Sequence, residues 1–120
     1  MTNIALIESK TSRTNWEDRF DNNFEIDRYA LCSDSSKKKI LKADVDIDID
    51  IDAYEWIIVV GSEALKFYTS VNSITEYSGK CVDDKFLPVI NPAMLSFKPE
   101  AKPLWDKSKS NVIDYINGDL

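Results

Sequence analysis

Four short apolar runs along the chain predict the strands of one sheet. Each run is rich in Ile, Val, Leu or aromatic residues and is bounded by polar or turn-forming residues. The runs occupy residues 3–9, 24–32, 56–60 and 86–90. The third, WIIVV, is apolar on both faces, as expected of a central strand in a parallel sheet.

The segments between these runs predict helices that return the chain for parallel pairing. Residues 14–17, TNWE, match the S/T-x-x-E capping box, so we expect a short helix capped by Thr14. Gly61 permits a tight turn, and Ser62 is expected to cap the next helix. We expect residues 73–82 to be a short extended piece with a turn at Gly79-Lys80. Residues 99–120 are expected to form a closing helix that stops at Gly118. The pattern predicts a three-layer αβα fold with a short, mostly parallel central sheet of about four strands.

A regular acidic row between the second and third runs is the most unusual feature. Aspartates alternate there with Val or Ile, and they are Asp44, Asp46, Asp48, Asp50 and Asp52. The pattern lacks the glycine and glutamate of a calcium-binding EF-hand loop. It favours an edge strand or an extended crossover whose acids hinder edge-to-edge pairing. A protein-binding acidic ridge is the other interpretation.

Composition narrows the classes of function. The 120 residues, 43% hydrophobic, are expected to form one compact domain over residues 1–120. A net charge of −6 argues against a broadly basic nucleic-acid binder, although a local patch such as Lys37, Lys38 and Lys39 could contact phosphate. With no histidine and two cysteines, the sequence excludes histidine-dependent catalysis, and we expect no metal and no cofactor. We see no signal peptide or membrane span and expect a cytoplasmic protein.

Several stretches together resemble the uracil-DNA glycosylase superfamily. IIVVGSEALKFY, GKCV and FLPVINPAML, followed by a closing helix, resemble its C-terminal half, and IALIES resembles its first strand. More closely, ESKTSRTNWEDRF, VVGSEALKFY, TEYSGK and INPAMLSFKPEAKP resemble the glycosylase-like segment at the N-terminus of some bacteriophage family A DNA polymerases. The resemblance implies a uracil-DNA glycosylase-like fold in a phage DNA replication protein, located in the host cytoplasm.

The departures from that family concern its catalytic motifs. Asn91 stands where the family has a histidine that stabilises negative charge near the uracil, and a neutral amide cannot become a cation. Glu8 lies near the position of the acid or asparagine that handles the attacking water, but the flanking Gly and Pro are missing. We therefore expect vestigial roles for Glu8 and Asn91 and little or no glycosylase activity. Asn91 also suits an ordinary turn before Pro92.

The function that we favour from the sequence is a non-catalytic module that binds DNA, a DNA polymerase or a processivity partner. Its contacts are expected on the rim where the carboxyl ends of parallel strands meet. The candidate contact residues are Lys10, Ser12, Arg13, Thr14, Ser62 and Asn91. One alternative is an acidic DNA mimic or inhibitor, since alternate aspartates on a strand lie about 7 Å apart, close to a phosphate spacing. The other alternative is a residual glycosylase built on Glu8 and Asn91.

Overall fold

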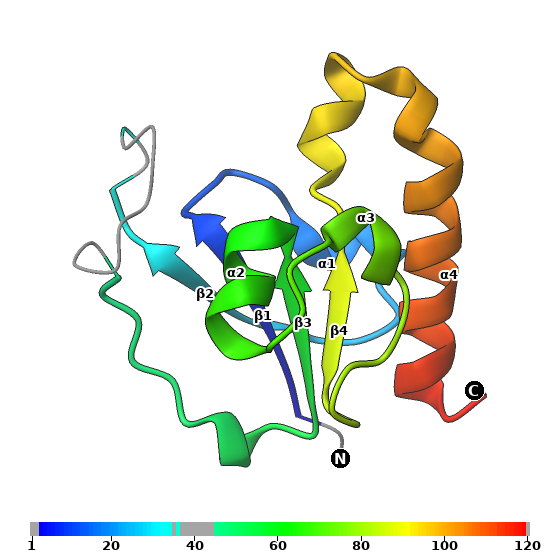
Figure 1. Cartoon of the computed structure of the whole chain (residues 1–120). Coiled ribbons are helices and arrows are strands. Elements are labelled where there is room, and N and C mark those ends of the chain that lie inside the picture. Colours follow the sequence, from blue (N-terminus) through cyan, green and yellow to red (C-terminus); the bar gives the residue numbers. More distant parts are fainter. Residues whose placement is uncertain (1–2, 35, 37–44, 120) are drawn as a thin grey trace.

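The computed structural model describes residues 3–34, 36 and 45–119 and shows one sheet of four parallel strands (Figure 1). The strand order is β2-β1-β3-β4. The strands are β1 Ile4–Lys10, β2 Asp27–Cys32, β3 Trp56–Val60 and β4 Phe86–Val89. The predicted α/β class and number of strands are confirmed. The predicted second strand is too long at its start, because β2 pairs with β1 only from Asp27 onward.

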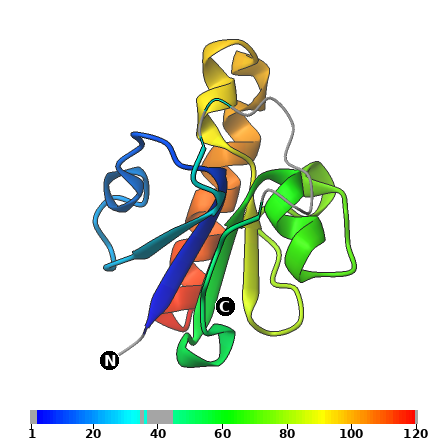
Figure 2. The same cartoon turned by 90° about the vertical axis from the view of Figure 1, so that its left-hand side faces the viewer.

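Two layers of helices enclose the sheet. One face is covered by α1, Trp16–Arg19, and α4, Lys102–Asn117. The other face is covered by α2, Gly61–Tyr68, and α3, Ile74–Tyr77. Figure 2 shows α1 and α2 on opposite sides of the strands. The predicted three-layer arrangement is therefore present in the described residues.

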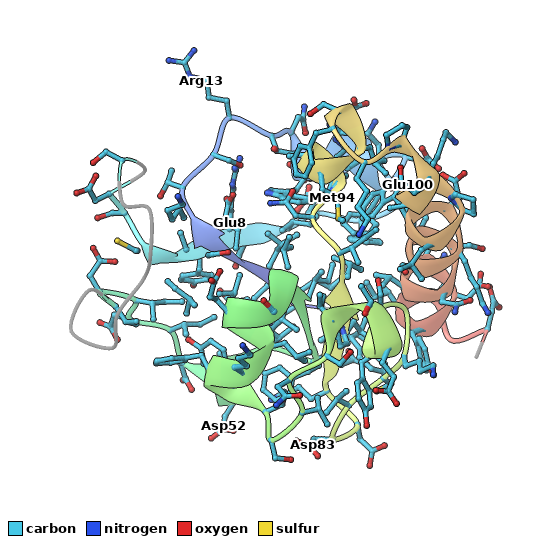
Figure 3. All side chains as sticks on the ribbon, turned by 45° about the horizontal axis from the view of Figure 1, so that its top comes forward. Glu8, Arg13, Asp52, Asp83, Met94 and Glu100 are labelled. Atoms are coloured by element: carbon cyan, nitrogen blue, oxygen red, sulfur yellow. The ribbon has the colours of Figure 1, made fainter. Side chains whose placement is uncertain are left out.

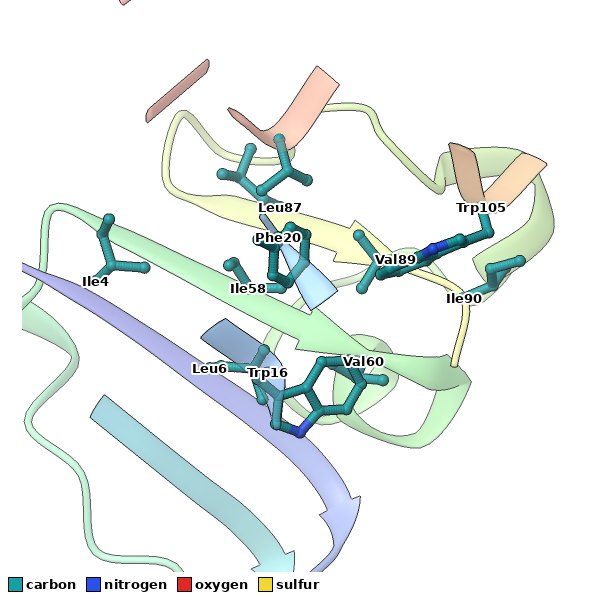
Figure 4. Packing of buried hydrophobic residues seen from close by; sticks show 11 residues of the cluster. Ile4, Leu6, Trp16, Phe20, Ile58, Val60, Leu87, Val89, Ile90 and Trp105 are labelled. Carbon is teal, nitrogen blue, oxygen red and sulfur yellow. The ribbon is translucent and has the colours of Figure 1, made fainter. Parts of the chain in front are cut away.

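The core on the α1 and α4 face is built from large apolar side chains. Phe20 is fully buried, and its ring centroid lies 5.7 Å from that of Trp105 (Figure 4). Removing one such side chain from water stabilises a fold by roughly 1.5–3 kcal/mol. On α4, Ser108 and Val112 are fully buried and Trp105 is 5% exposed. Among the described residues, no helix combines the length and apolar character needed to cross a bilayer.

Both predicted helix caps are wrong. Asn15 caps α1, because its Oδ1 accepts a hydrogen bond of 3.1 Å from the backbone N–H of Asp18. Thr14 is the residue before this cap. At α2, no side chain among the described residues caps the helix. The helix begins at Gly61 directly after the strand, so Ser62 already lies within its first turn. Gly61 makes this abrupt start possible through its positive φ of 83°.

The prediction of an extended segment over residues 73–82 is also wrong in its first half, where Ile74–Tyr77 form the helix α3. Ser73 Oγ accepts a hydrogen bond of 3.3 Å from the N–H of Glu76 and caps α3. Ser73 and Glu76 form an S-x-x-E pattern, which is the same capping signal as at residues 14–17. After α3 the chain crosses the free edge of β4, where Gly79 N–H donates to Pro88 C=O at 2.8 Å.

The acidic row forms an extended crossover between β2 and β3, one of the two arrangements that the sequence left open. Residues 45–50 belong to no strand of the sheet, but their burial alternates from one residue to the next, as in an extended segment. Their Val and Ile side chains pack against the core on the α2 side, while the aspartates are exposed. Asp50 then caps a short 3₁₀ turn, η2, at Ile51–Ala53. Asp44 and the lysine cluster Lys37, Lys38 and Lys39 lie outside the described residues.

Candidate functional site

The carboxyl ends of the four strands lie together at one end of the sheet, the carboxyl-end rim. The predicted contact residues lie on this rim. Glu8 and Lys10 lie at the C-terminal end of β1, and residues 12–14 belong to the loop that follows it. Ser62 follows β3, which is the neighbour of β1. A Cβ at Gly61 would lie 3.7 Å from Ser9 Oγ, so the start of α2 approaches the end of β1 closely.

The two candidate catalytic residues do not lie on neighbouring strands. Glu8 is on β1 and Asn91 follows β4, with β3 between them. Two strand spacings separate their backbones by about 10 Å. A water and a nucleobase held between them would have to span the whole width of β3.

Glu8 is a buried ion-pair partner. Its residue is only 3% exposed, on the face of β1 that α1 covers. Arg28, on the adjacent strand β2, places both Nε and Nη2 at 2.8 Å from Glu8 Oε2. A charge-assisted contact of this kind is stronger than a hydrogen bond between neutral groups.

The same arginine also fixes the loop after β1. Arg28 Nη1 donates to the carbonyl oxygen of Thr14 at 2.6 Å, and Nη2 donates to the carbonyl oxygen of Ser12 at 2.6 Å and to its hydroxyl at 3.0 Å. Ser12 is exposed, but its hydroxyl already accepts hydrogen bonds from Arg28 and, at 3.3 Å, from the N–H of Thr14. Sequence reasoning missed Arg28. The available signal was the alternation of apolar and polar residues at the start of residues 24–32. In that alternation Arg28 lies on the same face as Ile26, which is two residues before it.

Arg13 occupies the exposed side of this loop. Its side chain extends away from the molecule, at the same end as Met94 (Figure 3). Beneath the loop lies a hollow of about 280 Å³, lined by Arg13, Thr14, Asn15, Trp16, Glu17, Ile26 and Arg28. The buried indole N–H of Trp16 has no hydrogen-bond partner in the described part of the chain.

Asn91 caps the turn that follows β4. Its Oδ1 accepts a hydrogen bond of 3.0 Å from the N–H of Ala93 and begins η3, Pro92–Ser96. The residue is exposed, so only the amide nitrogen is left to donate to a ligand. The structure thus places Asn91 on the rim and gives it a local capping role.

Phe97 is a rim residue that sequence reasoning did not identify. It lies between η3 and η4, Pro99–Ala101, in the segment that projects beyond the carboxyl edge of the sheet at the top of Figure 1. Its side chain is 77% exposed, the highest value among the large apolar residues described. Lys98 follows it and is also exposed. The signal available in the sequence was an aromatic-lysine pair close to two prolines.

Negative charge gathers at the opposite end of the sheet. Asp52 and Asp83 lie at the amino ends of the strands, far from Arg13 in Figure 3. Glu55 and Asp84 are close to them in sequence and are exposed. The carboxyl-end rim carries Lys10, Arg13 and Lys98, although Glu100 is also at that end. Within the described ranges, no three Cys, Asp or Glu residues are grouped so that they could hold a metal ion.

Comparison with known proteins identifies a similarity to a phage replication enzyme. The chain is 30% identical to the DNA polymerase of Escherichia phage T5 over 129 aligned residues. The alignment covers 96% of this chain, which spans 15% of the length of that polymerase. No family model and no solved structure matches the chain. The similarity agrees with the phage polymerase part of the resemblance, and the glycosylase-like identity of the scaffold stays a prediction.

Proposed function

We propose that this chain is a non-catalytic, glycosylase-like module of a phage DNA replication protein and that its carboxyl-end rim contacts DNA. The similarity to a phage DNA polymerase over nearly the whole chain supports the replication context. The four-stranded parallel sheet, with helices on both faces, supports a glycosylase-type scaffold. The rim is the part of such a sheet where ligands bind.

The engagement of Glu8 by Arg28 is the observation that carries the non-catalytic part of this proposal. A group that activates water must reach the substrate, yet Glu8 is 3% exposed and its Oε2 receives two N–H groups of Arg28. Asn91 lies about two strand spacings away, and its side-chain oxygen is used by Ala93. Neither residue supports the preorganised electrostatics that base excision requires.

Three exposed side chains provide the DNA contacts in this proposal. Arg13 and Lys98 can approach phosphates, and Phe97 presents a free ring face on which an unpaired base can stack. The acids at the opposite end, including Asp52 and Asp83, favour an orientation with the rim toward the DNA. The net charge of −6 implies modest affinity with a strong dependence on salt.

Binding to fluorescent single-stranded and primer-template DNA over a series of salt concentrations tests the rim. Arg13→Glu should lower affinity by about tenfold, equivalent to about 1.4 kcal/mol. Lys66→Glu is the matched control, because Lys66 is an exposed cation on α2 and the charge change is the same. An equal loss in both variants would indicate general electrostatics and would remove the Arg13 loop from the interface.

Two further outcomes separate this proposal from its alternatives. Uracil-containing DNA incubated with the protein should acquire no abasic sites, and robust excision would establish the residual glycosylase. Absence of DNA binding even at low salt would overturn the DNA contact. If the protein then captured a basic DNA-binding protein through the exposed aspartates of residues 46–52, the acidic mimic would be the better explanation.

A further inference from the structure

A groove on the α2 side of the molecule has the features of a strand-addition site. It lies between the extended crossover and the C-terminal turn of α2 and has a volume of about 350 Å³. Its lining residues are Val45, Ile47, Asp48, Ile49, Phe67 and Tyr68. We propose that an extended segment of a protein partner, in which apolar and basic residues alternate, pairs with the backbone of residues 47–49 in this groove.

The backbone of the crossover is extended and unpaired. Among the described residues, the N–H and C=O groups of residues 47–49 make no hydrogen bond. The segment is nevertheless held at both ends. Asp46 N–H donates to Leu31 C=O at 2.9 Å, and Lys85 Nζ donates to Ile51 C=O at 2.8 Å. A fixed, extended and unpaired backbone is the template that strand addition uses, and its fixation lowers the entropy cost of binding.

The walls of the groove are suited to apolar side chains of an added strand. Ile47 and Ile49 pack against the core below the crossover. Across the groove, the Tyr68 ring is stacked on Phe86 with a centroid distance of 6.0 Å, which fixes this wall. Phe67 lies in contact with Tyr68 and is 45% exposed. A half-exposed aromatic ring beside an unpaired backbone is apolar surface that a partner can bury.

The exposed face of the crossover determines the charge of the partner. Asp48 and Asp50 point away from the core, on the opposite face from Ile47 and Ile49. In a paired strand, residues on the same face lie side by side, and opposite charges stabilise the pair. Basic residues of the partner would therefore lie beside the aspartates, and its apolar residues would enter the groove. The inference concerns a surface distinct from the carboxyl-end rim and does not rest on DNA binding.

A synthetic nine-residue peptide of alternating valine and lysine is a direct probe. Its binding is measured by fluorescence anisotropy, and the contact is located from changes in the NMR amide signals of residues 47–49. Two further peptides carry backbone N-methyl groups at alternate residues. One is methylated at the odd-numbered residues and the other at the even-numbered residues. The peptide whose methyl groups block the N–H groups that face the crossover should bind at least about tenfold more weakly than the unmethylated peptide. Methylation removes its hydrogen-bond donors while its charge is unchanged.

Two aromatic variants complete the test. Phe67→Ala should weaken peptide binding by about fivefold or more, since it removes the open wall of the groove. Phe97→Ala is the matched control. Phe97 is an exposed aromatic residue of the carboxyl-end rim, outside the groove, so its removal should leave peptide affinity unchanged. Absence of peptide binding at low salt would overturn the proposal. Equal binding of all three peptides, or no effect of Phe67→Ala, would show purely ionic attraction and would overturn it as well.

Discussion

Arg28 holds the carboxylate of Glu8 across the β1–β2 pair, with Nε and Nη2 both 2.8 Å from Oε2. Glu8 is almost fully buried, whereas the Arg28 side chain is 35% exposed. The remaining N–H groups of Arg28 bind the loop that carries Ser12 and Thr14. The pair therefore couples the interior of the sheet to the conformation of the proposed DNA-contacting loop.

Arg28→Met should destabilise the protein by about 2–4 kcal/mol, because it leaves the buried Glu8 carboxylate without its partner. Denaturant unfolding at neutral pH measures this cost. The double variant Glu8→Leu with Arg28→Met should recover much of the loss, since it removes the uncompensated charge as well. A cost below about 0.5 kcal/mol for Arg28→Met would show that Glu8 is solvated by other means.

The Tyr54 hydroxyl should make folding stability fall at alkaline pH. Its hydrogen bond with Tyr29, at 2.6 Å, is the main cause that raises the pKa of Tyr54, followed by burial and by the bond to Asp27. Unfolding returns the phenol to its ordinary pKa near 10.0, so the unfolded chain loses a proton that the folded chain keeps. This contribution to stability is complete below about pH 10 and declines as the pH rises above it.

Tyr54→Phe tests that alkaline effect. The variant should lose about 0.5–1.5 kcal/mol at neutral pH, the usual net value of a hydrogen bond, and should show a shallower loss of stability above pH 10. Spectrophotometric titration of the tyrosines, in the native protein and in Tyr29→Phe, provides an independent check. The pKa of Tyr54 should move back toward its ordinary value in Tyr29→Phe, and an unchanged titration would contradict the assigned cause.

Gly79 should tolerate alanine less well than Gly118, although both have a positive φ. A Cβ on Gly79 would lie 2.9 Å from the backbone Cα of Ser108, whereas a Cβ on Gly118 would meet no atom of the described residues within 4 Å. Gly118→Ala should cost about 1–2 kcal/mol for the left-handed backbone alone. Gly79→Ala should cost at least about 1 kcal/mol more, because α4 must move away from the α3–β4 connection. Equal melting temperatures would contradict this close approach.

Asn91 should behave as a capping residue. Asn91→Ala should cost about 0.5–1 kcal/mol, and Asn91→Asp should cost less because it keeps the oxygen that accepts from Ala93. Asn91→His should not create uracil excision, since Glu8 stays bound to Arg28. Thermal unfolding of the first two variants and an abasic-site assay of the third measure these outcomes. Strong excision by Asn91→His would show that a working pocket survives around it.

The hydrophobic pattern was sufficient to predict the strands, because their signal is local. Residues 56–60 are apolar on both faces and are buried on both. The short helix α3 was missed although Ser73 and Glu76 provide a capping signal. The helix has only four residues, Ile74–Tyr77, which is too short to show a helical pattern of apolar residues. The crossover illustrates a partial success. The sequence predicted its alternating apolar and acidic faces, but an edge strand and an unpaired connection have the same alternation.

The sequence by itself determined that the chain builds a parallel sheet with helical connections, that no histidine chemistry is available, and that aspartates line one face of an extended segment. Only the tertiary structure decided that Glu8 pairs with Arg28, twenty residues further along the chain. It also decided that residues 47–49 run beside Phe67 without a backbone partner in the described part of the chain. The physical reason is that strand periodicity is fixed by neighbouring residues. Ion pairing and groove formation depend on the register and packing of segments that are distant in sequence, and those are set by burial of the whole core.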